Sequence, residues 1–496
     1  MDMFPSFDDF SRNRRAGKHQ VIWTRLVSDL ETPVSAMLKL CHGRPFSFLL
    51  ESIEGGAVRG RYSIIGRDPD IIWRCRGGKA EINRDALCHS GVYSPSPLPP
   101  IEDLRQLLSA IRIDIPDQPL PMAAGLFGYL GYDMVHLMER IPESPPSGLD
   151  LPEAVLLRPT LLAIFDQIDN CFTLVTPAWF DAGQTAEAAY DTAAKRLKAA
   201  LDDLNRSLPL QPAASERLKQ EVEADSNMSE AQFKKMVEHA KEYIRAGDIF
   251  QVVLSQRFKR PFSLSPLNLY RAVRRLDPSP FLFFFDFNGF SVVGSSPEIM
   301  VRVRDGKITI RPIAGTRPRG LDGRSDSDLA AELLADPKEL AEHLMLVDLG
   351  RNDVGRVAKT GTVQVTERNA IEYYRHVMHI VSNVEGVLDP KYTALDALIA
   401  GFPAGTVSGA PKIRAMEIIA ELEPDRRGVY AGCIGYFGSN GSLDTCIAIR
   451  TAVIKDGYVH VQAGAGIVYD SDPEKEWRES KAKAEGMLRA AENALP

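Results

Sequence analysis

The hydrophobic pattern predicts a series of antiparallel β-hairpins. Apolar runs flank an Asn-Gly or Asp-Gly pair at three places, 281–293, 300–313 and 448–462. Such a pair between two apolar runs is the strongest short-range signal of a hairpin. A fourth hairpin is predicted over 154–176, around an Asp-Asn pair. The pattern therefore favours antiparallel sheet over a doubly wound fold, and no GxGxxG segment opens a helix.

The helical pattern indicates a boundary between two domains. The segment 182–208 is Ala-rich and helical, whereas 209–227 is polar and weakly patterned, as is typical of a linker. Ser229 and Gln232 then form a capping box at the start of an amphipathic helix that ends at Gly247. We therefore predict an N-terminal domain over residues 20–180, a helical and linker segment over 181–227, and a second domain over 228–490.

Composition excludes several classes of protein. The chain has 496 residues, 44% hydrophobic and 25% charged, which is enough apolar material for a large core. A net charge of −7 argues against binding nucleic acid by phosphate neutralisation. Apolar runs are too short to span a bilayer, no signal peptide is evident, and six scattered cysteines are typical of reduced thiols. We expect a cytoplasmic protein that binds neither nucleic acid nor membrane.

Two predicted helices carry paired glutamates, and each helix begins with an Asp-Pro pair. Glu339 and Glu342 lie on one helix, and Glu476 and Glu479 on the other. Residues three apart share a helix face. Four such carboxylates suit Mg²⁺, which prefers oxygen ligands. Solvated glutamates that favour the helix N-terminus would give the same pattern, so the spacing alone leaves both interpretations open.

Isolated polar residues in apolar surroundings are further candidates for catalytic or ligand-binding roles. Glu298 follows a strand and could be a general acid if burial raises its pKa. His379 lies beside an apolar run, where a histidine is more often a core residue than a base. Gln251 and Arg450 interrupt apolar strands and need polar partners if they face inward. The backbone of 464–466 could bind an anion, or it could form a simple tight turn.

Longer motifs resemble those of the chorismate-utilising enzymes, and most strongly those of anthranilate synthase large subunits. The resemblance covers most of residues 40–490. It implies an α+β fold of the anthranilate synthase type, with antiparallel β-sheets packed as a sandwich, helices on the outside and two intertwined domains. The motifs are PIAGTRPRG (312–320), ELAEHLMLVDLGRND (339–353), HVMHIVS (376–382), PAGTVSGAPK (403–412) and QAGAGIVYDSDPEKEW (462–477).

The resemblance implies that chorismate and ammonia are converted to anthranilate and pyruvate, the first committed step of L-tryptophan biosynthesis. Glu298 would protonate the departing hydroxyl, and His379, near Thr406, would take the ring proton as pyruvate leaves. The residues that would bind the substrate are Gly315, Thr316, Tyr430, Arg450, Gly464, Ala465, Gly466 and Lys483.

Mg²⁺ is the cofactor that the resemblance implies. Glu342 and Glu479 would coordinate it directly, with Glu339 and Glu476 nearby or bound through water. The chain has no cysteine in a G-x-C-x-G glutaminase setting. Ammonia would therefore come from a separate glutamine amidotransferase subunit, component II, in a heteromeric assembly that commonly contains two copies of each chain.

The resemblance also implies feedback inhibition by L-tryptophan. The LLES segment looks like the family's tryptophan-binding element, with Glu51 and Ser52 facing the inhibitor. The DPSPFLF segment supplies Pro280, Phe281 and Leu282 where the family more usually has Asn-Pro-Ser-Pro-Tyr-Met.

Two positions distinguish members of the family. Gln251 stands where the water-using isochorismate and salicylate synthases have a lysine base, and Ala314 where aminodeoxychorismate synthases commonly have a lysine nucleophile. Direct amination is therefore favoured. The alternatives are an aminodeoxychorismate synthase component I that works without the lysine, and a non-catalytic regulator that binds tryptophan or chorismate.

Overall fold

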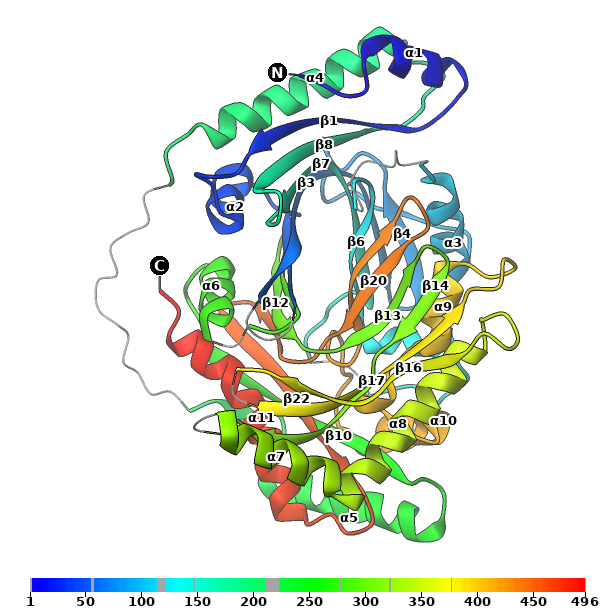
Figure 1. Cartoon of the computed structure of the whole chain (residues 1–496), viewed down its shortest axis with the longest axis vertical. Helices are drawn as coiled ribbons and strands as arrows, with labels where there is room; N and C mark the ends of the chain where they lie inside the picture. Colours follow the sequence, from blue (N-terminus) through cyan, green and yellow to red (C-terminus); the bar gives the residue numbers. More distant parts are fainter. Residues whose placement is uncertain are drawn as a thin grey trace.

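The computed structural model of the chain describes residues 2–54, 58–113, 122–145, 148–209, 223–276, 278–320, 323–375 and 377–495. Antiparallel strands form the interior and helices lie on the outside (Figure 1). This arrangement of strands and helices is the predicted α+β class. Within these ranges, no helix is long and apolar enough to cross a membrane.

Two long strands, β3 and β7, form the centre of the sheet. They pair along most of their length, and β7 continues into β8 and then β1. The β7–β8 pair is the hairpin predicted over 154–176, and Asn170 in its turn has a φ of +47°, which Asn tolerates better than most residues. The bounds are β1 Gln20–Val27, β3 Val58–Arg76, β4 Lys79–Asn83, β5 Ser94–Pro95, β7 Ala154–Asp166 and β8 Cys171–Ala178.

One wing of strands leaves β3 through β2. The order along it is β2, β11, β12, β21, β22 and β10, with β9 and β18 also paired to β10. The bounds are β2 Phe48–Glu54, β9 Asp225–Ser226, β10 Gln251–Pro261, β11 Phe281–Asp286, β12 Phe290–Ser296, β18 Gly409–Ala410, β21 Thr451–Lys455 and β22 Tyr458–Ile467.

A second wing leaves β7 through β6. The order is β6, β19, β20, β13, β14 and β17, and β17 also pairs with β15 and β16. The bounds are β6 Gly125–Leu130, β13 Ile299–Arg304, β14 Lys307–Ile310, β15 Ile313–Pro318, β16 Gln364–Tyr373, β17 Val377–Val387, β19 Cys433–Gly438 and β20 Leu443–Ile447.

Both halves of the chain contribute strands to each wing. β2 and β6 come from the N-terminal part, and they pair with β11 and β19 from the C-terminal part. The three hairpins predicted in the C-terminal half are confirmed as β11–β12, β13–β14 and β21–β22. The division of the chain at 181–227 stays a prediction, because most of the proposed linker, 210–222, lies outside the described residues.

Helices cover the outer surfaces of the central strands and of both wings. α1, α2 and α4 lie outside β1, β8 and β3, whereas α5, α7, α8 and α11 lie against β10, β17 and β22 (Figure 1). The predicted capping box of α5 and its left-handed Gly247 C-cap are confirmed, as are the Asp N-caps of α8 and α11. The bounds are α1 Phe7–Arg15, α2 Pro33–Cys41, α3 Pro100–Ala110, η1 Tyr132–Leu137, α4 Ala186–Leu204, α5 Glu230–Ala246, α6 Pro266–Leu276, α7 Gly323–Ala335, α8 Pro337–Gly355, α9 Ala394–Gly401, η2 Gly405–Val407, α10 Lys412–Leu422 and α11 Pro473–Glu492.

A core of aromatic side chains joins the two halves. Phe48 on β2 stacks on Phe127 of β6 and on Phe285 of β11, with ring centroids 4.7 and 5.2 Å apart. All three side chains are fully buried. Because these rings come from both halves of the chain, neither half completes this core alone.

Candidate functional site

Glu298 is a buried carboxyl at the corner between β12 and β13, and it is 6% exposed. Burial raises its pKa to about 8, an effect that the nearby Thr406 hydroxyl and Ile313 backbone only partly offset. The Thr406 hydroxyl is itself buried and, among the described residues, has no hydrogen-bond partner of ordinary length. A carboxyl that keeps its proton at neutral pH can act as a general acid.

His379 lies on β17 with its ring orientation fixed by β15. Its Nδ1 lies 2.8 Å from the Gly315 carbonyl oxygen and 3.1 Å from the Thr316 hydroxyl oxygen. A carbonyl oxygen can only accept, so we infer that Nδ1 carries the proton and Nε2 keeps a lone pair. Burial, with Arg450 and Lys483 nearby, lowers the pKa of His379. The ring is therefore neutral at neutral pH and can accept a proton at Nε2.

Groups suited to binding an anion converge on β22. Burial raises the pKa of Tyr430 to about 12, so its hydroxyl remains a donor. A Cβ added at Gly464 would lie 2.9 Å from that hydroxyl oxygen and 2.6 Å from the Leu254 carbonyl oxygen, so only glycine fits there. Lys483 of α11 donates to the Gly464 carbonyl at 3.1 Å. The positive charge of Arg450 acts on both Tyr430 and His379, where it partly offsets the effect of burial on Tyr430 and adds to the effect of burial on His379.

The four predicted glutamates form two like-charged pairs beside these groups. Burial and the neighbouring Glu342 raise the pKa of Glu339, and burial and Glu479 likewise raise that of Glu476. The charge of Lys338 interacts with both pairs. Each pair of neighbouring carboxylates, one in α8 and one in α11, is a pair that a nearby cation would stabilise.

The donor set fits Mg²⁺ better than a metal that needs a full protein cage. Across the described part of the chain, no three His, Cys, Asp or Glu side chains converge to chelate an ion. Mg²⁺ usually takes one or two carboxylates and completes its octahedral shell with water and substrate. Glu342 accepts from the Gln251 amide at 2.9 Å, and Glu479 pairs with Lys483 at 2.7 Å, so both carboxylates contact groups on or beside the β10–β22 pair.

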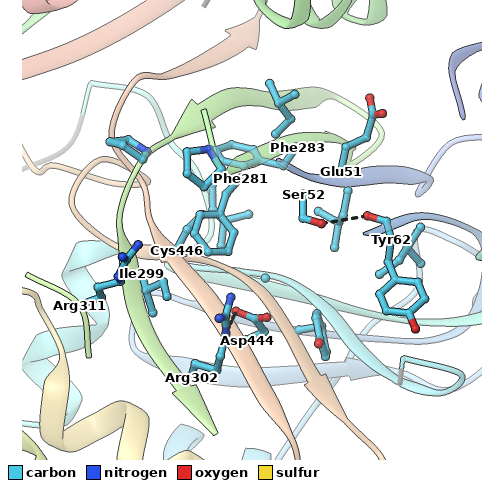
Figure 2. Close-up of a pocket in the computed structure, with 18 of the residues that line it drawn as sticks. Glu51, Ser52, Tyr62, Phe281, Phe283, Ile299, Arg302, Arg311, Asp444 and Cys446 are labelled. Carbon is cyan, nitrogen blue, oxygen red and sulfur yellow. Dashed lines mark hydrogen bonds and ion pairs between the residues drawn. The ribbon is translucent and has the colours of Figure 1, made fainter. Parts of the chain in front are cut away.

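A cavity of about 500 Å³ lies between the two wings (Figure 2). Its lining includes all the residues expected to contact tryptophan, because β2 and β11 are neighbours. Ser52 pairs with Phe281, and Glu51 pairs with Leu282. Pro280 precedes β11 and also lines the cavity.

Glu51 and Ser52 are consecutive residues of β2, so the pleat of the strand points their side chains in opposite directions. Ser52 lies beside the cavity and donates to the Tyr62 carbonyl at 3.2 Å, whereas the Glu51 carboxylate points away from it (Figure 2). Arg274 of α6 donates to Glu51 at 2.7 Å, and the Tyr270 hydroxyl also binds it. Consecutive strand residues point to opposite faces. The carboxylate of Glu51 therefore anchors β2 to α6, and only Ser52 of the two presents its side-chain polar atom on the cavity side.

The opposite wall consists of residues that the sequence did not single out. Arg302 of β13 pairs with Asp444 of β20 at 3.1 Å (Figure 2). Arg304 pairs with the same carboxylate. Tyr436 and Cys446 complete this wall. No short motif marks these residues, because their strands meet only through the β19–β20–β13 pairing.

Comparison with known proteins places this geometry in context. A family model described as chorismate binding enzyme matches residues 77–489. Anthranilate synthase component 1 of Cereibacter sphaeroides is 55% identical over 489 residues, covering 99% of this chain and 98% of that protein. The corresponding protein of Synechocystis sp. is 46% identical, covering 98% of both.

Solved structures show the same relationship. Anthranilate synthase component I from Streptococcus pneumoniae TIGR4 superposes with a TM-score of 0.78 at 36% identity, covering 94% of this chain and 99% of that one. MenF, the menaquinone-specific isochorismate synthase from Escherichia coli, gives a TM-score of 0.72 at 20% identity, covering 98% and 99%. The second likeness concerns the fold alone.

Proposed function

The chain belongs to the chorismate-binding enzyme family, and from this membership we propose that it is the catalytic component of an anthranilate synthase. It would convert chorismate and ammonia to anthranilate, pyruvate and water, in L-tryptophan biosynthesis. The observation that carries this proposal is the combination of a protonated buried acid, Glu298, with a neutral base, His379, in a chain 55% identical to anthranilate synthase component 1.

The two catalytic groups serve the two halves of the reaction. Glu298 gives its proton to the departing C4 hydroxyl, which leaves as water while ammonia adds at C2. His379 Nε2 then takes the C2 proton, and the enolpyruvyl group leaves as pyruvate when its methylene carbon gains a proton. Gly315 and Thr316 fix the tautomer of His379, and Tyr430 and Arg450 hold a substrate carboxylate with the backbone of 464–466.

The residues at the substrate end favour amination over hydration. Gln251 donates to Glu342 and has no basic atom to activate water. Its Oε1 is buried and has no partner among the described residues, so it is available to accept a hydrogen bond from a bound ligand. Ala314, in place of a lysine, offers no nucleophile for a covalent intermediate.

The purified chain is expected to form anthranilate from chorismate, Mg²⁺ and a high concentration of ammonium. Anthranilate is measured by its fluorescence, and pyruvate should appear in equal amount. Accumulation of an amino intermediate without pyruvate would instead indicate an aminodeoxychorismate synthase. Calorimetric binding of chorismate with no release of pyruvate would indicate a non-catalytic regulator.

Glutamine-derived ammonia would come from a separate glutamine amidotransferase subunit. The nearest approach to a glutaminase nucleophile in the sequence is Cys433, but it is buried within β19, where burial raises the pKa of its thiol to about 12. All six cysteines are free thiols. This agrees with a reducing compartment, and we place the reaction in the cytoplasm.

Mg²⁺ would be held by Glu342 and Glu479, with Glu339 and Glu476 supporting it. When bound, the ion would act as a Lewis acid on the ring carboxylate of the substrate. EDTA is expected to abolish activity and added Mg²⁺ to restore it. Glu479→Gln should weaken Mg²⁺ binding by roughly 10-fold or more, measured by calorimetry as well as activity.

The matched control for this prediction lies on the same helix. Glu485→Gln changes an exposed glutamate of α11 that pairs with Arg489, and it should leave Mg²⁺ binding unchanged. Equal Mg²⁺ affinity in Glu479→Gln and the wild type would show that this carboxylate is not a ligand.

The cavity between the wings is proposed as the tryptophan feedback site. Its volume suits a small-molecule ligand, and its walls combine aromatic rings with a few polar groups. Phe281 and Phe283 offer apolar surface for an indole, while Ser52 and Arg302 offer polar contacts. L-tryptophan is accordingly expected to inhibit ammonium-dependent anthranilate formation.

A further inference from the structure

We propose that Tyr374 is a positioning residue that transmits occupancy of the cavity to His379. This inference rests on the proposed function, in which His379 is the base and the cavity takes the inhibitor. It assigns to one buried tyrosine the physical link between the two sites.

Tyr374 touches both sites. Its side chain lines the cavity and is 8% exposed. Its ring meets the His379 ring edge to face, with centroids 5.4 Å apart. Its backbone is fixed on both sides, because its carbonyl accepts from Arg319 at 2.7 Å and its N–H donates to Val377 at 2.8 Å. The side chain is therefore the part of Tyr374 that is free to move.

The hydroxyl of Tyr374 is held by the cavity wall. It donates to Glu372 at 2.8 Å, and burial together with Glu372 raises its pKa, so it stays a donor. Glu372 is paired with Arg311 at 2.6 Å, and Arg311 also pairs with Glu367. Both Arg311 and Glu372 line the cavity, with Arg311 at one end of it (Figure 2). A ligand that engages either member of this pair changes the acceptor that holds Tyr374.

The same wall of the cavity also contacts Glu298, the proposed general acid. Ile313 lines the cavity, and its backbone interacts with Glu298. Burial is the main cause of the lowered pKa of His379, and Tyr374 is one of the groups that bury it. The charged groups that act on His379 are Arg450, Lys483 and Glu372. A shift of Tyr374 would therefore alter both the position and the solvation of the base.

The test compares two variants of the full chain. Tyr374→Phe keeps the ring against His379 and removes the bond to Glu372, whereas Tyr374→Leu removes both. Anthranilate formation with ammonium is measured with and without saturating L-tryptophan, and tryptophan binding is measured by calorimetry without chorismate. Tyr374→Phe should raise the activity left at saturating tryptophan by roughly 5-fold or more, within the usual range of coupling between sites. The coupling is scored as the ratio of inhibited to uninhibited kcat in the same variant, with tryptophan made saturating by its measured Kd, so that direct effects of the substitution on kcat or on tryptophan binding do not count as coupling.

Tyr374→Leu has a different expected signature. Removing the ring admits water to His379, so the pKa of His379 should rise toward its ordinary value. The acid limb of the kcat/KM profile should then move to higher pH, which a general loss of stability would not produce. Tyr190→Phe on α4 is the control, because it also removes one tyrosine hydroxyl bond, the one to the Pro5 carbonyl.

The outcomes separate the inference from the proposed function. Full tryptophan inhibition in Tyr374→Phe, with an unshifted pH profile in Tyr374→Leu, would overturn the coupling role. A wild-type chain that makes no anthranilate, or that tryptophan does not inhibit, would instead overturn the proposed function. Normal binding with weakened inhibition in Tyr374→Phe alone would support the inference.

Discussion

Replacing Glu298 by glutamine is expected to lower kcat for anthranilate formation by about 10²–10⁴-fold, the usual contribution of a general acid. Glutamine matches the shape of the side chain but cannot release a proton to the departing hydroxyl. Burial raises the pKa of Glu298 to about 8, so the carboxyl is already neutral at pH 7 and the substitution removes no charge. The loss should therefore appear in kcat while the fold stays intact.

The pH profile gives this prediction a second readout. The proposed mechanism needs Glu298 protonated and His379 neutral, so the wild-type rate should fall as pH rises through about 8 and fall again in acid as His379 gains a proton. Glu298→Gln should lose the alkaline limb from its residual rate. Glu238→Gln, on the exposed face of α5, is the control. More than a tenth of wild-type kcat in Glu298→Gln would contradict the acid role.

Local signals in the sequence predicted the hairpins and helix ends well. The turns of β11–β12, β13–β14 and β21–β22 need residues that tolerate positive φ, and Asn288, Asp305 and Asp456 supply them at +55°, +50° and +51°. A turn is specified by residues that are adjacent in the chain, so a short pattern suffices. The same holds for the capping residues of the helices.

The sequence pattern does not predict which distant strands pair with each other. No local signal places β2 beside β11 or β6 beside β19, since each pairing joins segments hundreds of residues apart. The far wall of the cavity depends on such pairings, which is why Tyr436 and Asp444 were missed. The side-chain direction of Glu51 depends on strand pleat and on Arg274, and the resemblance carried neither.

The proposed catalytic residues were identified from motifs, but their chemical states come from the surroundings. The protonated state of Glu298 follows from its burial, and the tautomer of His379 from a carbonyl on a neighbouring strand. Both depend on contacts between distant segments. A motif names the residue that acts, whereas its pKa is set by the fold around it.

The second large effect is on stability, at a buried ion pair that contacts β10. Arg427 and Glu423 have side chains 1% and 3% exposed, and Arg427 donates to both Glu423 oxygens at 2.9 and 2.6 Å. Arg427 also donates to the carbonyls of Val407 and Val253 at 2.7 Å. Ser255 donates to Glu423 through its N–H and its hydroxyl, each at 2.8 Å. The pair therefore joins β10, η2 and the end of α10.

Glu423→Gln is expected to lower the free energy of unfolding by about 3–5 kcal/mol, because it leaves the buried guanidinium charge of Arg427 without its counter-ion. Urea unfolding followed by circular dichroism measures this. Glu485→Gln, which breaks the exposed pair with Arg489, should cost less than about 1 kcal/mol. A double variant, Glu423→Leu with Arg427→Met, removes both charges and should recover part of the loss, but not all, since the carbonyls of Val253 and Val407 lose their donor. Equal losses in Glu423→Gln and Glu485→Gln would mean that water reaches the buried pair. A double variant less stable than Glu423→Gln would show that the hydrogen bonds, rather than the paired charges, provide the stabilisation.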